Sequence, residues 1–220
     1  MKVFLKKFID NFLFLKTLSE VNLFRMEGEI LTAKTVIIGL SAVGKTCIAN
    51  RYFSDTFDNM TQSTMGSQFF EGYIKLSENK TFKFEVWDTA GQENYMALAP
   101  VFFTEATIAI LVYDVTRPET LHGLDYYVKV LKETAPDCFI AVCGNKIDLV
   151  DRRKVEYTEG VKYSESIGST FFIETSAKTD EGIKTLFESL SRQEGLHFKK
   201  KNGLNEQIGN EKPKESAGCC

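Results

Sequence analysis

The sequence has little of what marks nucleic-acid-binding, disordered or membrane-spanning proteins. Only four of its 220 residues are proline, and it has no tract rich in glycine and serine or in glutamine and asparagine, which argues against a disordered or low-complexity chain. Its 27 basic and 30 acidic residues give a net charge of -3, without the positive excess that holds nucleic acid through general basicity. No apolar run approaches the roughly 18 residues that span a bilayer, which excludes a transmembrane protein.

Cysteine is also scarce, and its five positions fit neither a zinc motif nor a disulfide framework. Three lie in segments that we expect to be helix or strand and two end the chain: Cys47, Cys138, Cys143, Cys219 and Cys220. This arrangement favours a reduced, cytosolic setting in which the first three are small apolar groups. The hydrophobic fraction of 43% and the charged fraction of 26% are those of a globular domain with a proper core.

Short apolar or alternating runs are interspersed with helical patterns between residues 31 and 196. The runs predict strands at residues 34–39, 68–76, 81–87, 107–113, 139–144 and 170–174. The helical patterns predict helices at residues 45–53, 119–134, 158–168 and 182–196. Strands that alternate with helices predict an α/β domain whose parallel sheet is covered on both faces and binds ligands at the carboxyl ends of its strands. A hairpin turn at residues 77–80 makes the sheet mixed.

The two ends of the chain differ from this domain. Residues 1–30 form an N-terminal extension in which phenylalanine and leucine are interleaved with lysine, so that an amphipathic surface helix and an artefactual extension both remain open. The extension is a poor secretory signal, and Met26 would serve as a start that loses nothing from the domain. Residues 197–220 contain almost no apolar side chains, and we expect a flexible tail there.

Residues 39–46, Gly-Leu-Ser-Ala-Val-Gly-Lys-Thr, match the phosphate-binding loop pattern between an expected strand and an expected helix. The glycines let the backbone N–H groups approach phosphate oxygens, and the helix adds its positive N-terminal end. Lys45 would neutralise the β and γ phosphates, and the Thr46 hydroxyl would ligate Mg2+. By itself this motif predicts only that a nucleoside triphosphate binds.

Residues 87–93, Trp-Asp-Thr-Ala-Gly-Gln-Glu, follow the third expected strand. At a strand end beside a phosphate loop, Asp88 can hold Mg2+ through water. Gly91 allows the backbone to approach the γ phosphate, and Gln92 has the donor and the acceptor that orient an attacking water. A purely structural role would suit any one of these residues but not the whole segment.

Two further motifs separate guanine from adenine. Residues 145–148, Asn-Lys-Ile-Asp, follow the expected strand 139–144, and the Asp148 carboxylate can accept from both N1–H and the exocyclic amine of guanine. Adenine offers no such pair, so it would leave the carboxylate unsatisfied, and discrimination of that kind reaches about 10^4 or more. Residues 175–178, Thr-Ser-Ala-Lys, are placed to offer backbone N–H groups to guanine O6.

The order and spacing of these motifs resemble those of the Ras-like small GTPases, and of the Rab family in particular, over about residues 31–196. Rab-like features include Phe57 seven residues before Thr64, residues 63–66 (Ser-Thr-Met-Gly) and the final Cys219-Cys220. Residues 41–43 (Ser-Ala-Val) and 98–100 (Leu-Ala-Pro) are similar to those of the early-endosomal subgroup. The resemblance implies the P-loop NTPase fold of small GTPases: a mostly parallel six-stranded sheet with one antiparallel edge strand and helices on both faces.

The resemblance also implies a role for each matching residue. The residues expected to contact GTP or GDP are Ser41, Ala42, Val43, Gly44, Lys45, Thr46, Cys47, Phe57, Thr64, Gly91, Asn145, Lys146, Asp148, Ser176, Ala177 and Lys178. Those expected at Mg2+ are Thr46, Thr64 and Asp88, and Gln92 is the expected catalytic residue. The Phe57 ring would stack on guanine, and Thr64 would close over Mg2+ and the γ phosphate.

Departures from the family pattern fall on the face that partners contact. Met65 stands where isoleucine or valine is usual, Asn94 where arginine is common, and residues 102–105 are Phe-Phe-Thr-Glu rather than an aromatic pair with Arg-Gly. By resemblance, Phe69, Trp87 and Phe102 form the aromatic triad that displays the nucleotide state, so that with Met65 they face effectors. The alternative is that the three rings are plain core or partly exposed aromatics.

Cys219 and Cys220 resemble the double-cysteine Rab ending, which carries two geranylgeranyl chains and thus meets the two-signal requirement for stable membrane anchoring. The implied protein is a monomeric switch that cycles between cytosol and the cytoplasmic face of an intracellular membrane, with an endosomal membrane as the candidate. Its partners would be an exchange factor, a GTPase-activating protein, effectors, a prenylation escort and a GDP-dissociation inhibitor. Nucleic acid is not expected among them.

The sequence therefore predicts a Rab-type GTPase that hydrolyses GTP slowly, since no arginine is placed to act in cis on the leaving phosphate. Without an activating protein the rate would be on the order of 10^-4 to 10^-3 per second. Two alternatives stay open, a P-loop ATPase or kinase and a guanine-nucleotide-dependent interaction module that never hydrolyses. Residues 1–25 could also direct the protein to another membrane.

Overall fold

The computed structural model describes residues 28–58, 67–89 and 99–198 of the chain. Its strands are β1 (Glu29–Ile38), β2 (Ser67–Ser77), β3 (Lys80–Thr89), β4 (Ile108–Asp114), β5 (Phe139–Asn145) and β6 (Phe171–Thr175). Its helices are α2 (Lys45–Ser54), α3 (Ala99–Phe103), α4 (Pro118–His122), α5 (Leu124–Thr134), α6 (Tyr157–Ser166) and α7 (Ile183–Ser191), with a short 3-10 helix η2 (Val150–Arg152).

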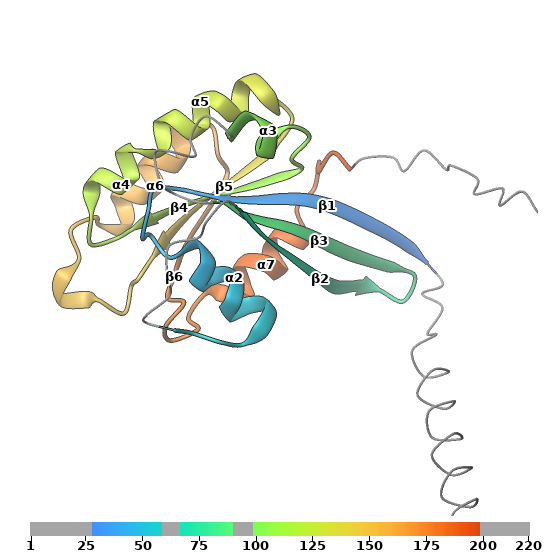
Figure 1. Cartoon of the computed structure of the whole chain (residues 1–220), viewed down its shortest axis with the longest axis horizontal. Helices are drawn as coiled ribbons and strands as arrows, with labels where there is room; N and C mark the ends of the chain where they lie inside the picture. Colours follow the sequence, from blue (N-terminus) through green and yellow to red (C-terminus); the bar gives the residue numbers. More distant parts are fainter. Residues whose placement is uncertain (1–27, 59–66, 90–98, 199–220) are drawn as a thin grey trace, which may run out of the picture.

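The strands form one six-stranded sheet in the order β2-β3-β1-β4-β5-β6. β2 pairs antiparallel with β3. The other four neighbouring pairs, β3–β1, β1–β4, β4–β5 and β5–β6, are parallel. Figure 1 shows α2 and α7 on one side of the sheet and α3, α4 and α5 on the other. The predicted fold, a mostly parallel six-stranded sheet with one antiparallel edge strand and helices on both faces, is confirmed.

The central strands are apolar on both faces because helices cover both sides of the sheet. All seven residues of β4 are buried. Since successive side chains point to opposite faces, Ile110 packs in the cluster beneath α2 and α7, whereas Leu111 packs in the cluster beneath α5. This sandwich holds the carboxyl ends of β1, β4, β5 and β6 side by side at one edge.

Several element boundaries differ from those predicted. The expected helix 119–134 is two helices, α4 and α5, which meet at Gly123. The expected helix 182–196 ends at Ser191, and the short α3 was not predicted. The first strand starts at Glu29 rather than residue 34, since β1 stays in register with β3 as far as the pair Glu29 and Lys80.

The described chain ends against the sheet rather than at the end of α7. The Phe198 ring lies 5.7 Å from the buried Phe82 ring, and the His197 carbonyl accepts a hydrogen bond from Thr107. Phe82 pairs with Leu31 near the start of β1, so this docking point lies at the opposite end of β1 from the loop that follows it. Across the described ranges, no helix has the length and apolar character needed to cross a bilayer.

Candidate functional site

The loop at residues 39–46 joins the carboxyl end of β1 to the first residue of α2. Both of its glycines have positive φ, 149° at Gly39 and 99° at Gly44. A Cβ atom at Gly39 would collide with the Val112 carbonyl oxygen, and one at Gly44 would collide with the Asn145 side-chain amide. The loop thus follows its path only because these two positions lack a side chain.

Five consecutive carbonyl groups of this loop each accept a hydrogen bond from a side chain. Lys45 Nζ donates to the first two carbonyls, at 2.9 and 3.0 Å, and the other donors come from beyond β4 and from the end of β5. Those donors are Arg117 Nη2 to Ser41 at 2.9 Å, Lys146 Nζ to Ala42 at 2.7 Å and Asn145 Nδ2 to Val43 at 2.9 Å. Holding the carbonyls from outside leaves the loop's N–H groups to line its concave side, the arrangement of an anion-binding nest.

Lys45 is the buried cation of this loop. Its side chain is almost fully buried, and burial lowers its pKa to about 8, although the nearby Asp88 carboxylate acts in the opposite direction. A buried ammonium that is poorly compensated favours the approach of an anion. The position suits the phosphate-neutralising role predicted for this lysine.

Thr46 and Asp88 supply two oxygen atoms beside the loop. The Thr46 hydroxyl donates to Asp88 Oδ2 at 2.5 Å, which joins the first turn of α2 to the end of β3. Hydroxyl and carboxylate oxygens are the hard ligands that Mg2+ prefers, and sites of this class complete the metal shell with substrate phosphates and water. The described residues contain no group of three His, Cys, Asp or Glu side chains that could hold a metal ion. As oxygen donors, Thr46 and Asp88 fit two positions of a Mg2+ shell.

Asn145 links the loop to the segment after β6. Its Oδ1 atom accepts hydrogen bonds from the Thr175 hydroxyl and the Ala177 N–H, both at 3.3 Å, while its amide donates to the Val43 carbonyl. One side chain therefore fixes both predicted base-recognition motifs against the phosphate loop. Such cross-links hold the carboxyl ends of adjacent strands in one place.

Asp148 is held beside this segment. Its Oδ1 atom accepts a hydrogen bond from the Ser176 hydroxyl at 2.7 Å, and Lys178 Nζ lies 3.9 Å from its Oδ2 atom. The carboxylate is only 11% exposed. A carboxylate that is oriented and mostly desolvated can distinguish donors from acceptors on a ligand.

Arg51 was not predicted to belong to the site. From the last turn of α2, its Nε atom donates to the Ala177 carbonyl at 2.9 Å, and its guanidinium lies 5.9 Å from the centre of the Phe57 ring. Phe57, which we predicted to stack on the base, is thereby associated with the same segment as Asp148. No sequence pattern predicts this role of Arg51, because the acceptor of its hydrogen bond is a backbone carbonyl.

Asp114 is a second residue that sequence reasoning missed. At the end of β4 its Oδ2 atom lies 2.8 Å from Lys146 Nζ and 3.3 Å from Arg117 Nε, while Oδ1 accepts from the backbone and hydroxyl of Thr116 at 2.9 and 2.7 Å. Burial alone would raise the pKa of Asp114, but hydrogen bonds from Lys146 and Thr116 hold it below its ordinary value. An acidic residue at the carboxyl end of a parallel strand, two residues before a threonine, was the available signal.

A sequence model of the Ras family matches residues 34–194. The chain belongs to this family. Its curated relatives place it among the Rab proteins, as the resemblance implied. GTP-binding protein ypt5 of Schizosaccharomyces pombe is 40% identical over 77% of this chain and 81% of its own length.

Other Rab proteins match to a similar degree. Ras-related protein Rab-31 of Homo sapiens is 38% identical over 85% of this chain and 96% of its own length. Ras-related protein Rab5 of Nicotiana tabacum is 40% identical over 74% of this chain and 81% of its own length. Each match covers most of this chain and most of its relative, so the similarity extends well beyond a single motif.

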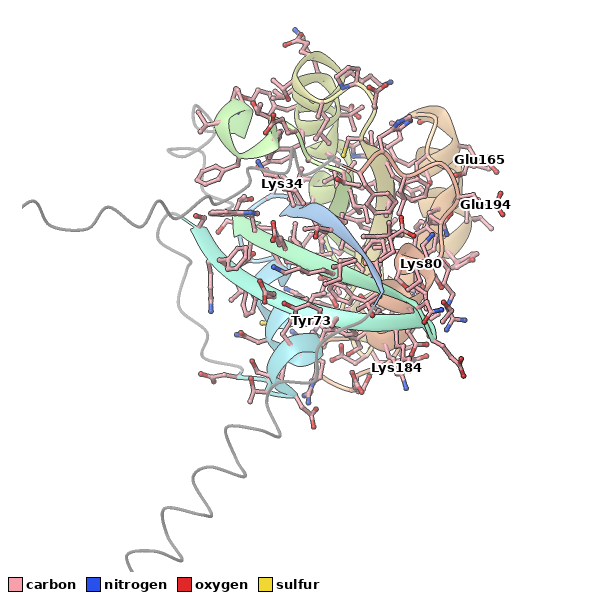
Figure 2. The ribbon with its side chains drawn as sticks, turned by 90° about the vertical axis from the view of Figure 1, so that its right-hand side faces the viewer. Lys34, Tyr73, Lys80, Glu165, Lys184 and Glu194 are labelled. Atoms are coloured by element: carbon pink, nitrogen blue, oxygen red, sulfur yellow. The ribbon has the colours of Figure 1, made fainter. Side chains whose placement is uncertain are left out.

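The three predicted effector-facing aromatics of this Ras-family chain do lie together. The Phe69 and Trp87 rings are 5.2 Å apart in an edge-on arrangement, and Trp87 and Phe102 are 6.4 Å apart. Phe69 is 47% exposed on β2, whereas Trp87 and Phe102 are partly buried against the core beneath α5. Their effector-facing role stays a prediction. In the view of Figure 2, β2 is an outer strand and carries Tyr73 further along.

Several predicted site residues lie outside the described part of the chain. They are Thr64, Met65, Gly91, Gln92, Asn94, Cys219 and Cys220. Cys47, predicted to contact nucleotide, is half-buried directly after Thr46 in α2. Each of these roles stays a prediction.

Proposed function

We propose that this Rab protein is a guanine-nucleotide switch that binds GTP with Mg2+, hydrolyses it to GDP and recruits effectors to an intracellular membrane. One observation carries the proposal: the phosphate loop and the two base-recognition motifs are joined into a single unit at the carboxyl edge of the sheet. Asn145 makes that junction, since it bonds both the Val43 carbonyl and the Ala177 N–H.

The residues of the loop would hold the phosphates. With its carbonyls held by four side chains, the loop presents its N–H groups, and Lys45 adds a buried positive charge. Thr46 and Asp88, with Thr64, would hold Mg2+, which when bound neutralises charge on the phosphate oxygens. The proximity of Thr46 and Asp88 supports this assignment for two of the three residues.

The base would contact the Asp148 carboxylate, the backbone of residues 175–178 and the ring of Phe57. The Ser176 hydroxyl already directs a donor at Asp148 Oδ1, which orients the carboxylate. Guanine satisfies such a group with N1–H and its amine, whereas adenine does not. The proposal therefore favours GTP over ATP and disfavours the ATPase or kinase alternative.

Hydrolysis and switching are assigned to Gln92, Thr64 and Gly91. Gln92 would orient the attacking water, and the other two would order their segments only while the γ phosphate is present. A single-turnover assay with radiolabelled GTP tests this part. We expect a slow release of phosphate from the wild type and at least a tenfold slower release from Gln92→Leu; a wild type that never releases phosphate would indicate the non-hydrolysing module instead.

Membrane attachment is assigned to Cys219 and Cys220 through prenyl groups, and an endosomal membrane is proposed from the resemblance of residues 41–43 and 98–100 to the early-endosomal subgroup. Phe198 docks near Phe82, at the far end of β1 from the phosphate loop. A tail that begins there starts at the end of the sheet away from the nucleotide site. An exchange factor, a GTPase-activating protein, effectors, a prenylation escort and a GDP-dissociation inhibitor are the proposed partners.

The division of the chain is part of the same proposal: residues 1–30 as an extension, 31–196 as the GTPase domain and 197–220 as the lipid-bearing tail.

Displacement of fluorescent GDP tests nucleotide specificity directly. Unlabelled GTP should displace it stoichiometrically, and ATP should fail to do so at a thousandfold excess. Equal displacement by ATP would overturn the guanine-specific function.

A further inference from the structure

The Arg117 side chain contacts the phosphate loop from a position that no motif of the chain assigns. It lies three residues after the end of β4, at the residue before α4, and its Nη2 atom donates to the Ser41 carbonyl at 2.9 Å. Its Nε atom faces Asp114 Oδ2 at 3.3 Å, so one guanidinium joins a buried carboxylate to the loop. The two contacts use different nitrogen atoms of one planar guanidinium, a geometry that a single lysine ammonium does not share.

Ser41 is the middle carbonyl of the five that are held. The two before it are held by Lys45, which belongs to the loop itself, and the two after it are held by the end of β5. Arg117 supplies the side-chain hydrogen bond to the Ser41 carbonyl, which lies between these two sets. Without it, the loop would be anchored at each end but not at Ser41.

Arg117 lies on the carbonyl side of the loop rather than on its N–H side. Phosphates bind to the N–H side, so this arginine does not substitute for a catalytic arginine that reaches the leaving phosphate.

We infer that Arg117 is a positioning residue that holds Ser41 in the phosphate-binding conformation and thereby slows release of the bound nucleotide. The inference rests on the proposed function. Release requires the loop to open, and opening breaks a charge-assisted hydrogen bond that the closed loop keeps. Asp114 retains Lys146 and Thr116 when Arg117 is removed, so the loss should act on the loop and not on the fold.

The experiment compares dissociation of fluorescent GDP from the wild type, Arg117→Ala and Arg117→Lys in excess unlabelled GDP with Mg2+. We expect release from Arg117→Ala to be about three- to tenfold faster, because the lost bond is charge-assisted but partly exposed to solvent. Arg117→Lys, which keeps one donor, should fall between the two. Arg192→Ala is the matched control, since Arg192 is exposed beyond α7.

Hydrogen exchange separates positioning from general stability. Arg117→Ala should exchange faster in the peptide that contains residues 39–46 and at the wild-type rate in the peptide that contains α7. Unchanged GDP release from Arg117→Ala, or faster exchange throughout the chain, would overturn the inference. A wild type that retains no GDP would instead overturn the proposed function on which it rests.

Discussion

Asp114 at the end of β4 and Lys146 after β5 form an ion pair with a distance of 2.8 Å between Oδ2 and Nζ. The carboxylate is 3% exposed, and the same ammonium donates to the Ala42 carbonyl at 2.7 Å. The pair therefore connects the core of the sheet to the phosphate loop. Loss of this ion pair should therefore affect both the stability of the fold and the position of the phosphate loop.

Replacing Asp114 with asparagine should lower the free energy of unfolding by about 2–4 kcal/mol at pH 7. The reason is that Lys146 and Arg117 then lose the buried negative charge with which they pair. Urea unfolding in saturating GDP measures the change. Asp137→Asn, at an exposed position before β5, is the control and should be neutral. Equal effects of the two substitutions would contradict the role given to Asp114.

The Asp114 effect should also depend on pH in one direction. Its pKa is held below the ordinary value, so the folded chain binds fewer protons than the unfolded chain as the carboxylate titrates. The stabilisation is then fully present above the ordinary aspartate pKa of about 4 and is lost as the pH falls through the lower folded value. The stability difference between wild type and Asp114→Asn should shrink below about pH 4; a difference that grows on acidification would contradict this sign.

Thr46→Ala should remove most of the Mg2+ dependence of GDP binding, because the hydroxyl that faces Asp88 is lost. We expect affinity in the presence of Mg2+ to fall about 10- to 100-fold, with little change in EDTA. Thr46→Ser keeps the hydroxyl and should retain the dependence. Titrations of fluorescent GDP with and without Mg2+ measure both, and a Mg2+ response that survives in Thr46→Ala would exclude this residue as a ligand.

Asp148→Asn should change the preferred base. The amide cannot accept from both N1–H and the amine of guanine, so GDP affinity should fall at least about 100-fold, whereas xanthosine diphosphate, with a carbonyl in place of the amine, should bind better than to the wild type. Competition assays with the two diphosphates test this. Asp151→Asn, exposed on η2 three residues away, should leave both affinities unchanged.

Gly160→Ala should destabilise the fold although it replaces glycine within a helix. Such a change usually adds about 0.5–1 kcal/mol to stability, but here the new Cβ atom would collide with Tyr113 Oη and lie 2.6 Å from Phe172 Cζ. We expect a loss of about 1–3 kcal/mol. Tyr113→Phe should cost little by itself, since its buried hydroxyl has no hydrogen-bond partner among the described residues, and should recover part of the loss in the double variant. Strict additivity of the two changes would contradict the proposed contact.

The fold could be predicted from the sequence because its signals are local and repeated. Buried strands such as β4 are continuous apolar runs, and the hairpin between β2 and β3 lies between two alternating segments. Boundaries that depend on contacts between distant segments could not be predicted. The start of β1 at Glu29, for example, is set by its pairing with Lys80, which lies far away in the sequence.

The site divides in the same way. Residues 39–46, Asp88, Asn145 and Asp148 could be predicted to meet because each follows a strand, and parallel strands end at one edge of the sheet. Arg117 and Arg51 were missed because each donates to a backbone carbonyl. Every residue has a backbone carbonyl, so the sequence does not show which one will be the acceptor. Asp114 was missed because its ion pair with Lys146, which follows β5, depends on how the folded chain places the two strand ends.

Mass spectrometry of the protein isolated from its own cells, with the bound nucleotide extracted and identified, tests the central claim most directly. The account predicts GDP or GTP at close to one molecule per chain, together with two prenyl groups at Cys219 and Cys220. An unmodified terminus would remove the membrane part of the account and leave the switch. Adenine nucleotide, or protein that is folded without any nucleotide, would contradict the guanine site itself.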